Sequence, residues 1–141
     1  MRNRDINSFL LHQNISYRPN LNWEFGLDSE LGFEKDLIPE RDLNLQYSKL
    51  LGRINYSILK KGRISSEFEY QDVKIIDNPN DLVVPFEMAR GKKAGVNQRW
   101  QLRGEYTVAE NVVFTLFYSG RDDANFDKVI HTGQVEIRAY F

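Results

Sequence analysis

The two histidines are the first candidates for chemistry, because histidine is the side chain whose charge changes most readily near neutral pH. His12 lies in the segment LLHQNISY and His131 in the segment VIHTGQVE. Hydrolytic chemistry would also need a nucleophile and a carboxylate that orients the imidazole, and no motif beside either histidine supplies that pair. We therefore predict that the chain is not an enzyme, that His12 is a polar strand residue, and that His131 is a rim residue at the start of the last strand.

The segment RDDANFD brings three carboxylates close together in the sequence, those of Asp122, Asp123 and Asp127. Calcium takes six or more oxygen ligands, and an EF-hand loop supplies them from alternate positions before a closing glutamate. RDDANFD has neither the alternation nor the closing glutamate, so we interpret it as a solvated turn. We expect no cofactor and no metal site, and these aspartates are the candidates if a cation does bind.

The composition excludes several classes of protein. The 141 residues suffice for one domain, and a formal net charge of −1 provides no basic surface for nucleic acid. The chain has no cysteine, which excludes disulfides and thiol chemistry. No run approaches the roughly eighteen apolar residues of a membrane helix. A membrane β-barrel is still open, because its wall needs an apolar residue only at every second position.

Long strands of alternating polarity would position these residues. In LNWEFGLDSELGFE (21–34), apolar side chains fall on one phase and charged or small ones on the other, as in a strand with two different faces. We predict an all-β fold, an antiparallel up-and-down meander in a single domain, 1–141. The seven expected strands lie at about 6–17, 21–34, 42–59, 63–73, 96–108, 112–118 and 131–141.

The third strand contains a conflict of phase. Leu45 and Tyr47 are apolar at odd positions, whereas Ile54 and Tyr56 are apolar at even positions. A β-bulge near Leu51 and Gly52 would bring both halves onto one face. The alternative is a hairpin turn at residues 50–52, which would make eight strands.

The connections between the expected strands alternate in length. With the third strand continuous, they run short, medium, short, very long, short and medium, so all the short ones meet at one end of the sheet. Bacterial outer-membrane barrels have this asymmetry, with short periplasmic turns and longer external loops. The regularity favours the bulge over the extra hairpin. Strands of about eleven to fourteen residues also suit a tilted membrane span better than a soluble sheet.

The two phases of the strands predict two faces with different surroundings. Aromatic side chains gather towards both ends of the apolar phase, as in the interfacial girdles of membrane barrels. The lipid-facing residues would be Tyr17, Trp23, Phe25, Tyr56, Trp100, Tyr106, Phe114 and Tyr118. The polar phase would face a wet lumen with charges of both signs, those of Glu24, Asp28, Glu30, Glu67, Glu69, Arg99, Arg103 and Arg138.

A soluble fold would use the same two phases differently. In a soluble β-barrel or sandwich the charged phase would be solvated, and the apolar phase would enclose a core or a pocket. Trp23, Phe25 and Trp100 would then line that space. Such a module would bind a small apolar ligand or a protein partner, and it is the alternative to the membrane wall.

The chain ends HTGQVEIRAYF, an alternating strand that closes on a phenylalanine. This ending resembles the insertion signal of bacterial outer-membrane β-barrels, which the barrel-assembly machinery reads. Val135, Ile137 and Phe141 share the apolar phase and match the signal. The resemblance implies a place in the bacterial outer membrane, with the lipid bilayer and the assembly machinery as partners. It implies a role in the wall of a pore, a transporter or a membrane-anchored scaffold.

An odd number of strands conflicts with a complete barrel of this kind. If Phe141 lies on the periplasmic side, seven strands place Met1 outside, whereas single-chain bacterial barrels have an even number of strands and both termini in the periplasm. The first strand would also leave an unpaired edge in hydrocarbon. We therefore expect the C-terminal portion of a larger barrel, whose remaining strands come from the same protein or from another chain. A complete eight-stranded barrel is the alternative if the third strand is split.

Overall fold

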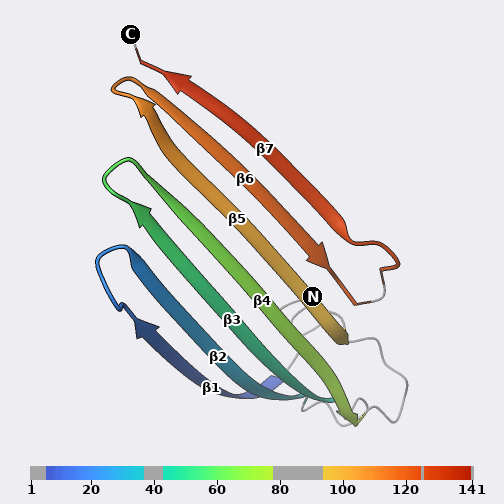
Figure 1. Cartoon of the computed structure of the whole chain (residues 1–141). Coiled ribbons are helices and arrows are strands. Elements are labelled where there is room, and N and C mark those ends of the chain that lie inside the picture. The colour runs from blue at the N-terminus through green and yellow to red at the C-terminus, as the bar shows by residue number, and fades with distance from the viewer. Residues whose placement is uncertain (1–5, 37–42, 78–93, 125, 141) are drawn as a thin grey trace.

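The chain folds into one antiparallel sheet in a computed structural model, which describes residues 6–36, 43–77, 94–124 and 126–140. The sheet has seven strands in the order β1-β2-β3-β4-β5-β6-β7, so each strand pairs with its neighbours along the chain (Figure 1). The strands are β1 Ile6–Tyr17, β2 Trp23–Asp36, β3 Asn44–Ile58, β4 Gly62–Asp77, β5 Gly95–Ala109, β6 Val112–Asp122 and β7 Ile130–Ala139. All the pairings are antiparallel, which confirms the predicted up-and-down meander. The described residues contain no helix with the length and apolarity needed to cross a membrane.

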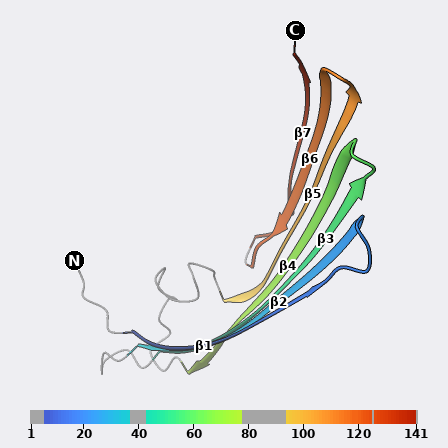
Figure 2. The same ribbon diagram turned by 90° about the vertical axis from the view of Figure 1, so that its left-hand side faces the viewer.

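The sheet is a single curved layer with a concave and a convex face (Figure 2). Side chains on a concave face converge and shield one another from solvent. The polar phase of the strands carries most of the buried side chains, including those of Asp36, Gln71 and Asn97, and we assign it to the concave face. The apolar phase is then convex, and many of its large side chains are exposed, as in Leu27 at 42% and Phe68 at 45%.

β3 is one continuous strand, but the predicted bulge at Leu51 and Gly52 is absent. The pairing of β3 with β2 is unbroken, and its register shift against β4 lies between Asn44 and Leu45 instead. The hairpin alternative is absent too, so the described sheet has seven strands and not eight. The bulge prediction was wrong because it assumed that all the apolar residues of this strand share one face.

The first half of β3, together with Leu43 just before it, instead contributes a small core to the concave face. Leu43, Leu45 and Tyr47 are 1%, 1% and 4% exposed, and they pack with Val73 of β4. The Tyr47 ring lies over Gly32 of β2, where an added Cβ would overlap it. The apolar residues of β3 therefore lie on the concave face in the first half of the strand and on the convex face in the second half. The change occurs because the concave face has a packed core beside the first half.

The strands are staggered along the sheet. One row of paired residues begins at the last residue of β1, near the short connections, and reaches β7 close to its first residue. The row is Tyr17, Phe25, Ile54, Ser66, Leu102, Tyr118 and Gly133. Measured from the ends near the short connections, the row thus lies deeper in β5 than in β3, and deeper in β3 than in β1, and it stays at a similar depth from β5 to β7. A cumulative displacement of this kind is the shear that tilts the strands of a barrel against its axis.

The connections alternate in length as predicted. At one end they are residues 18–22, 59–61 and 110–111, and at the other end they are residues 37–43, 78–94 and 123–129. The turn at 59–61 is tight: Leu59 and Lys60 have positive φ, and the Lys61 amide donates a hydrogen bond to the Ile58 carbonyl oxygen, 2.6 Å away. β1 and β7 are the two edges of the sheet, and both run towards the end with the short connections.

Candidate functional site

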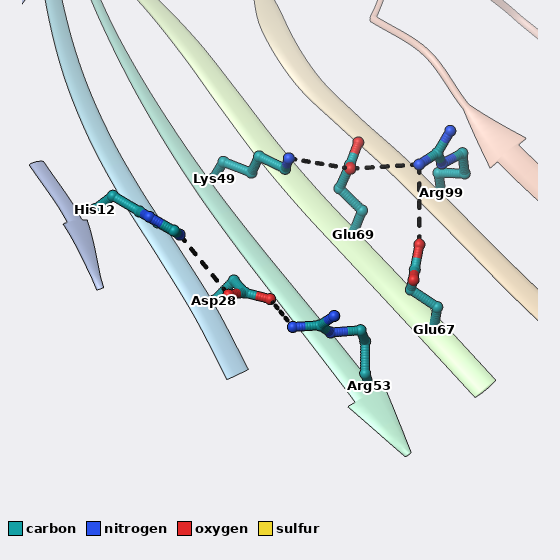
Figure 3. A network of polar contacts seen from close by, with 7 residues as sticks. All are labelled: His12, Asp28, Lys49, Arg53, Glu67, Glu69 and Arg99. Carbon is teal, nitrogen blue, oxygen red and sulfur yellow. Dashed lines mark hydrogen bonds and ion pairs between the residues drawn. The ribbon is translucent and has the colours of Figure 1, made fainter. Parts of the chain in front are cut away.

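The concave face carries a network of charged side chains, and Asp28 is one of its centres (Figure 3). Asp28 lies on β2, between β1 and β3, with a side chain that is 14% exposed. One carboxylate oxygen lies 2.5 Å from the Arg53 guanidinium, and the other lies 3.7 Å from Nε2 of His12. The amide of Asn14 donates a hydrogen bond to the same carboxylate. These contacts join β1, β2 and β3 through one carboxylate that is largely shielded from solvent.

A second chain of ion pairs crosses from β3 to β5 (Figure 3). The Lys49 ammonium lies 3.6 Å from the Glu69 carboxylate. The Arg99 guanidinium lies 3.5 Å from Glu69 and 3.9 Å from Glu67. Glu69 is only 12% exposed, so its two cationic partners offset the desolvation of its charge. The arrangement alternates in sign from strand to strand.

The residues predicted to face a lumen all lie on this concave phase of the strands. Six of the eight form ion pairs: Glu24 with Arg18, Arg138 with Glu136, and Asp28, Glu67, Glu69 and Arg99 as described above. Glu30 has a contact of its own. Arg103 differs, because it forms no ion pair or side-chain hydrogen bond with the described residues. The structure thus brings the predicted residues together on one face, and of these eight only Arg103 has no side-chain partner in the described part of the chain.

The residues predicted to form aromatic girdles all lie on the convex phase. Some lie near the short connections and others lie towards the long connections. Near the short connections, Trp23 contacts Tyr56 with ring centroids 4.5 Å apart, and Phe25 with centroids 5.7 Å apart. Tyr106 and Phe114 face each other across β5 and β6 at the same end of the sheet. Tyr17 closes β1 and is 64% exposed.

A further aromatic cluster lies towards the long connections. Trp100 covers Gly120, where an added Cβ would overlap the indole ring. The indole nitrogen donates to the Tyr118 hydroxyl at 3.5 Å, and that hydroxyl lies 2.9 Å from Nδ1 of His131. The Tyr118 and His131 rings stack. His131 therefore takes part in an aromatic cluster of the convex face, and His12 in the Asp28 network.

The three aspartates of the segment RDDANFD lie at the end of β6 and in the 123–129 connection. Asp122 is the last residue of β6, and Asp123 lies 3.6 Å from the Arg121 guanidinium. Within the ranges that the structure describes, no three His, Cys, Asp or Glu side chains are grouped so that they could hold a metal ion.

The predicted assembly signal lies on the outer edge strand. Val135 and Ile137 are on the convex phase of β7 and are 61% and 68% exposed. Phe141 lies outside the described residues.

Phe117, an aromatic residue on the polar phase of β6, is not among the residues predicted from the sequence. Phe117 pairs with Arg103 and Gln134 in one row of the sheet. The signal was present in the sequence, because Phe117 interrupts the polar phase between Thr115 and Ser119. The interruption is hard to recognise because Leu116 and Tyr118, on both sides of Phe117, are apolar or aromatic as well.

The comparisons with known proteins identify no relative. No protein-family model, no curated protein and no solved structure matches the chain.

Proposed function

We propose that the chain forms part of the wall of a bacterial outer-membrane β-barrel, contributing to a pore, a transporter or a membrane-anchored scaffold. The observation that carries this proposal is the convex face. Apolar side chains occupy it on all seven described strands, with Leu31, Ile54 and Leu102 among those exposed. Contiguous apolar surface of this extent is unusual in water and is typical of surfaces that contact a membrane or a partner.

The connections, the stagger and the concave face support the same proposal. Short connections at one end and long ones at the other are the pattern of outer-membrane barrels. Tilted, staggered strands are required to close a barrel. Ion pairs on the concave face would be hydrated in a lumen, whereas in a bilayer they would be costly. Each feature has a direct role in a membrane wall.

The edges of the sheet define what would complete such a barrel. β1 and β7 run in the same direction, so pairing them with each other would create a parallel seam. An all-antiparallel closure requires an odd number of further strands between them. Two copies in the same membrane orientation would meet β7 to β1 and would again form parallel seams. We therefore propose that the missing strands belong to another segment of the same protein or to a different chain.

Bromine quenching of tryptophan fluorescence tests the membrane role. The single-tryptophan variants Trp23→Phe and Trp100→Phe would be reconstituted in vesicles of phosphatidylcholine with brominated acyl chains. Both remaining tryptophans lie on the convex phase, so both should be strongly quenched. The matched control is Gln101→Trp in a background without Trp23 and Trp100, because residue 101 lies on the opposite face of the same strand and should be quenched much less.

The outcome that contradicts the proposal is a folded monomer in plain buffer whose tryptophans are not quenched by the vesicles. That result would favour the alternative, a soluble β module. The ligand of such a module would be small and apolar. It would bind in a cavity of about 320 Å³ near the long connections, which is lined in part by Phe9, Phe33 and Ile76.

A further inference from the structure

We propose that Arg103 and Phe117 form a binding site for a small aromatic carboxylate on the concave face. The two residues face each other across β5 and β6. They lie in a row with Asn55, Ser65 and Gln134 that crosses the strands from β3 to β7. The proposal depends on the concave face only, and it holds whether the convex face meets lipid or protein.

Two adjoining cavities of about 210 Å³ each meet at these residues. Arg103 and Phe117 line both cavities. The first cavity extends towards β3 and β4, and the second extends towards β7, where Thr115 and Gln134 line it. Each is smaller than the roughly 300–1,000 Å³ of a site for a drug-sized molecule, so the ligand should be small.

The charges around the cavities leave Arg103 available for an anion. Arg53 lies 2.5 Å from Asp28. The two carboxylates in the linings have arginines of their own: Glu67 lies 3.9 Å from Arg99, and Glu136 lies 2.6 Å from Arg138. Arg103 forms no ion pair with the described residues. Among the guanidiniums and carboxylates that line the cavities, it alone has a charge without a partner in the described part of the chain.

The chemistry of the lining selects the ligand. A guanidinium binds a carboxylate through two parallel hydrogen bonds, which fixes the orientation of the anion. The Phe117 ring offers an apolar surface against which a flat ring can stack. The neutral side chains of Asn55, Gln101 and Gln134 can hydrogen-bond to hydroxyl substituents. A benzoate-like molecule satisfies both the charge and the ring, whereas acetate satisfies only the charge.

Calorimetric titration of the folded full chain with benzoate tests this site, with circular dichroism confirming that each variant keeps its β-sheet. We expect saturable binding, which benzamide and acetate should not match. Arg103→Gln should weaken benzoate binding by about tenfold or more, the range of a lost charge-assisted interaction. The matched control is Arg121→Gln, which removes the same charge from the concave phase of β6 outside both cavities and should change the affinity less than about twofold.

Two further variants separate the roles of charge and ring. Phe117→Leu should weaken benzoate binding but leave the weak binding of acetate unchanged. Arg103→Lys retains the charge without the bidentate geometry, so it should bind benzoate more tightly than Arg103→Gln and more weakly than the unaltered chain. The proposal is overturned if the unaltered chain does not bind benzoate, or if Arg103→Gln and Arg121→Gln weaken binding equally, since general electrostatic attraction would then account for the binding.

Discussion

The contact between Tyr47 and Gly32 predicts that even the methyl group of alanine destabilises the fold at position 32. A Cβ added to Gly32 would overlap Cε1, Cζ and the hydroxyl oxygen of the Tyr47 ring. The ring is 4% exposed within the core with Leu45 and Val73, so it cannot swing into solvent without breaking that core. Overpacking of this kind costs about 1–3 kcal/mol. Alanine is otherwise preferred to glycine in a strand by about 0.5–1 kcal/mol, which offsets part of this cost. We expect Gly32→Ala to lower the free energy of unfolding by about 1–2 kcal/mol.

Gly52 provides the matched control on the adjacent strand. A Cβ added there meets nothing within 4 Å. Neither glycine has a positive φ, so both backbones accept alanine. Gly52→Ala should therefore stabilise the fold by about 0.5–1 kcal/mol. Denaturant titrations followed by far-ultraviolet circular dichroism, in one solvent or detergent for all variants, measure both effects.

A double-mutant cycle identifies the cause. In the background of Tyr47→Ala, the substitution Gly32→Ala should lose its penalty, because the ring that it overlaps is gone. If Gly32→Ala and Gly52→Ala have the same effect, or if the penalty persists without the Tyr47 ring, the proposed packing between β2 and β3 is refuted.

Two other predictions concern the faces of the sheet. Leu45→Ala should lower the free energy of unfolding by about 2–4 kcal/mol in denaturant titrations, because Leu45 is 1% exposed in the concave core. Leu50→Ala, on the convex phase at 43% exposure, should lower it much less. Equal losses would contradict the assignment of the two residues to opposite faces. Asp28→Asn removes the charge that pairs with Arg53 and should cost about 0.5–1 kcal/mol, a difference that shrinks in 1 M salt. The ion pair of Glu24 with Arg18 is more exposed, so Glu24→Gln should lower the free energy of unfolding less than Asp28→Asn does. A larger loss of stability for Glu24→Gln would contradict the role given to burial.

Strand existence and direction were predictable from the sequence because the pattern of alternation is local. In 21–34 the side chains of one strand contain the whole signal, and the structure places β2 at Trp23–Asp36. The end at which each connection lies follows once the strands are counted. The placement of the predicted convex and concave residues on opposite faces follows from the same two-residue period.

The faces of β3 were not predictable in this way. Leu45 and Ile54 are equally apolar, and nothing within the strand shows that one contacts a core and the other points outward. That difference depends on Gly32 and Val73 of the neighbouring strands, which make room for Tyr47 and cover it. A bulge was the simplest way to give one strand one apolar face, and it failed because both faces have an apolar part. The Arg103–Phe117 pairing was hidden for a similar reason, since it depends on the register between β5 and β6.

The register also explains why Arg103 lacks a partner on a face with so many carboxylates. The concave phase of β2 holds acidic residues and no basic one: Glu24, Asp28, Glu30, Glu34 and Asp36. β3 lies beside β2, and its cations Lys49 and Arg53 are within reach of acidic residues on β2 and β4. Arg103 lies on β5, two strands beyond β3, where its neighbours across the sheet are Ser65 and Phe117. Glu67 lies on β4, next to β5, but its carboxylate already forms an ion pair with Arg99. β2 thus carries more carboxylates on the concave face than any other strand, and Arg103 lies three strands away from it, so an anion entering this face would be repelled from β2 and attracted to Arg103.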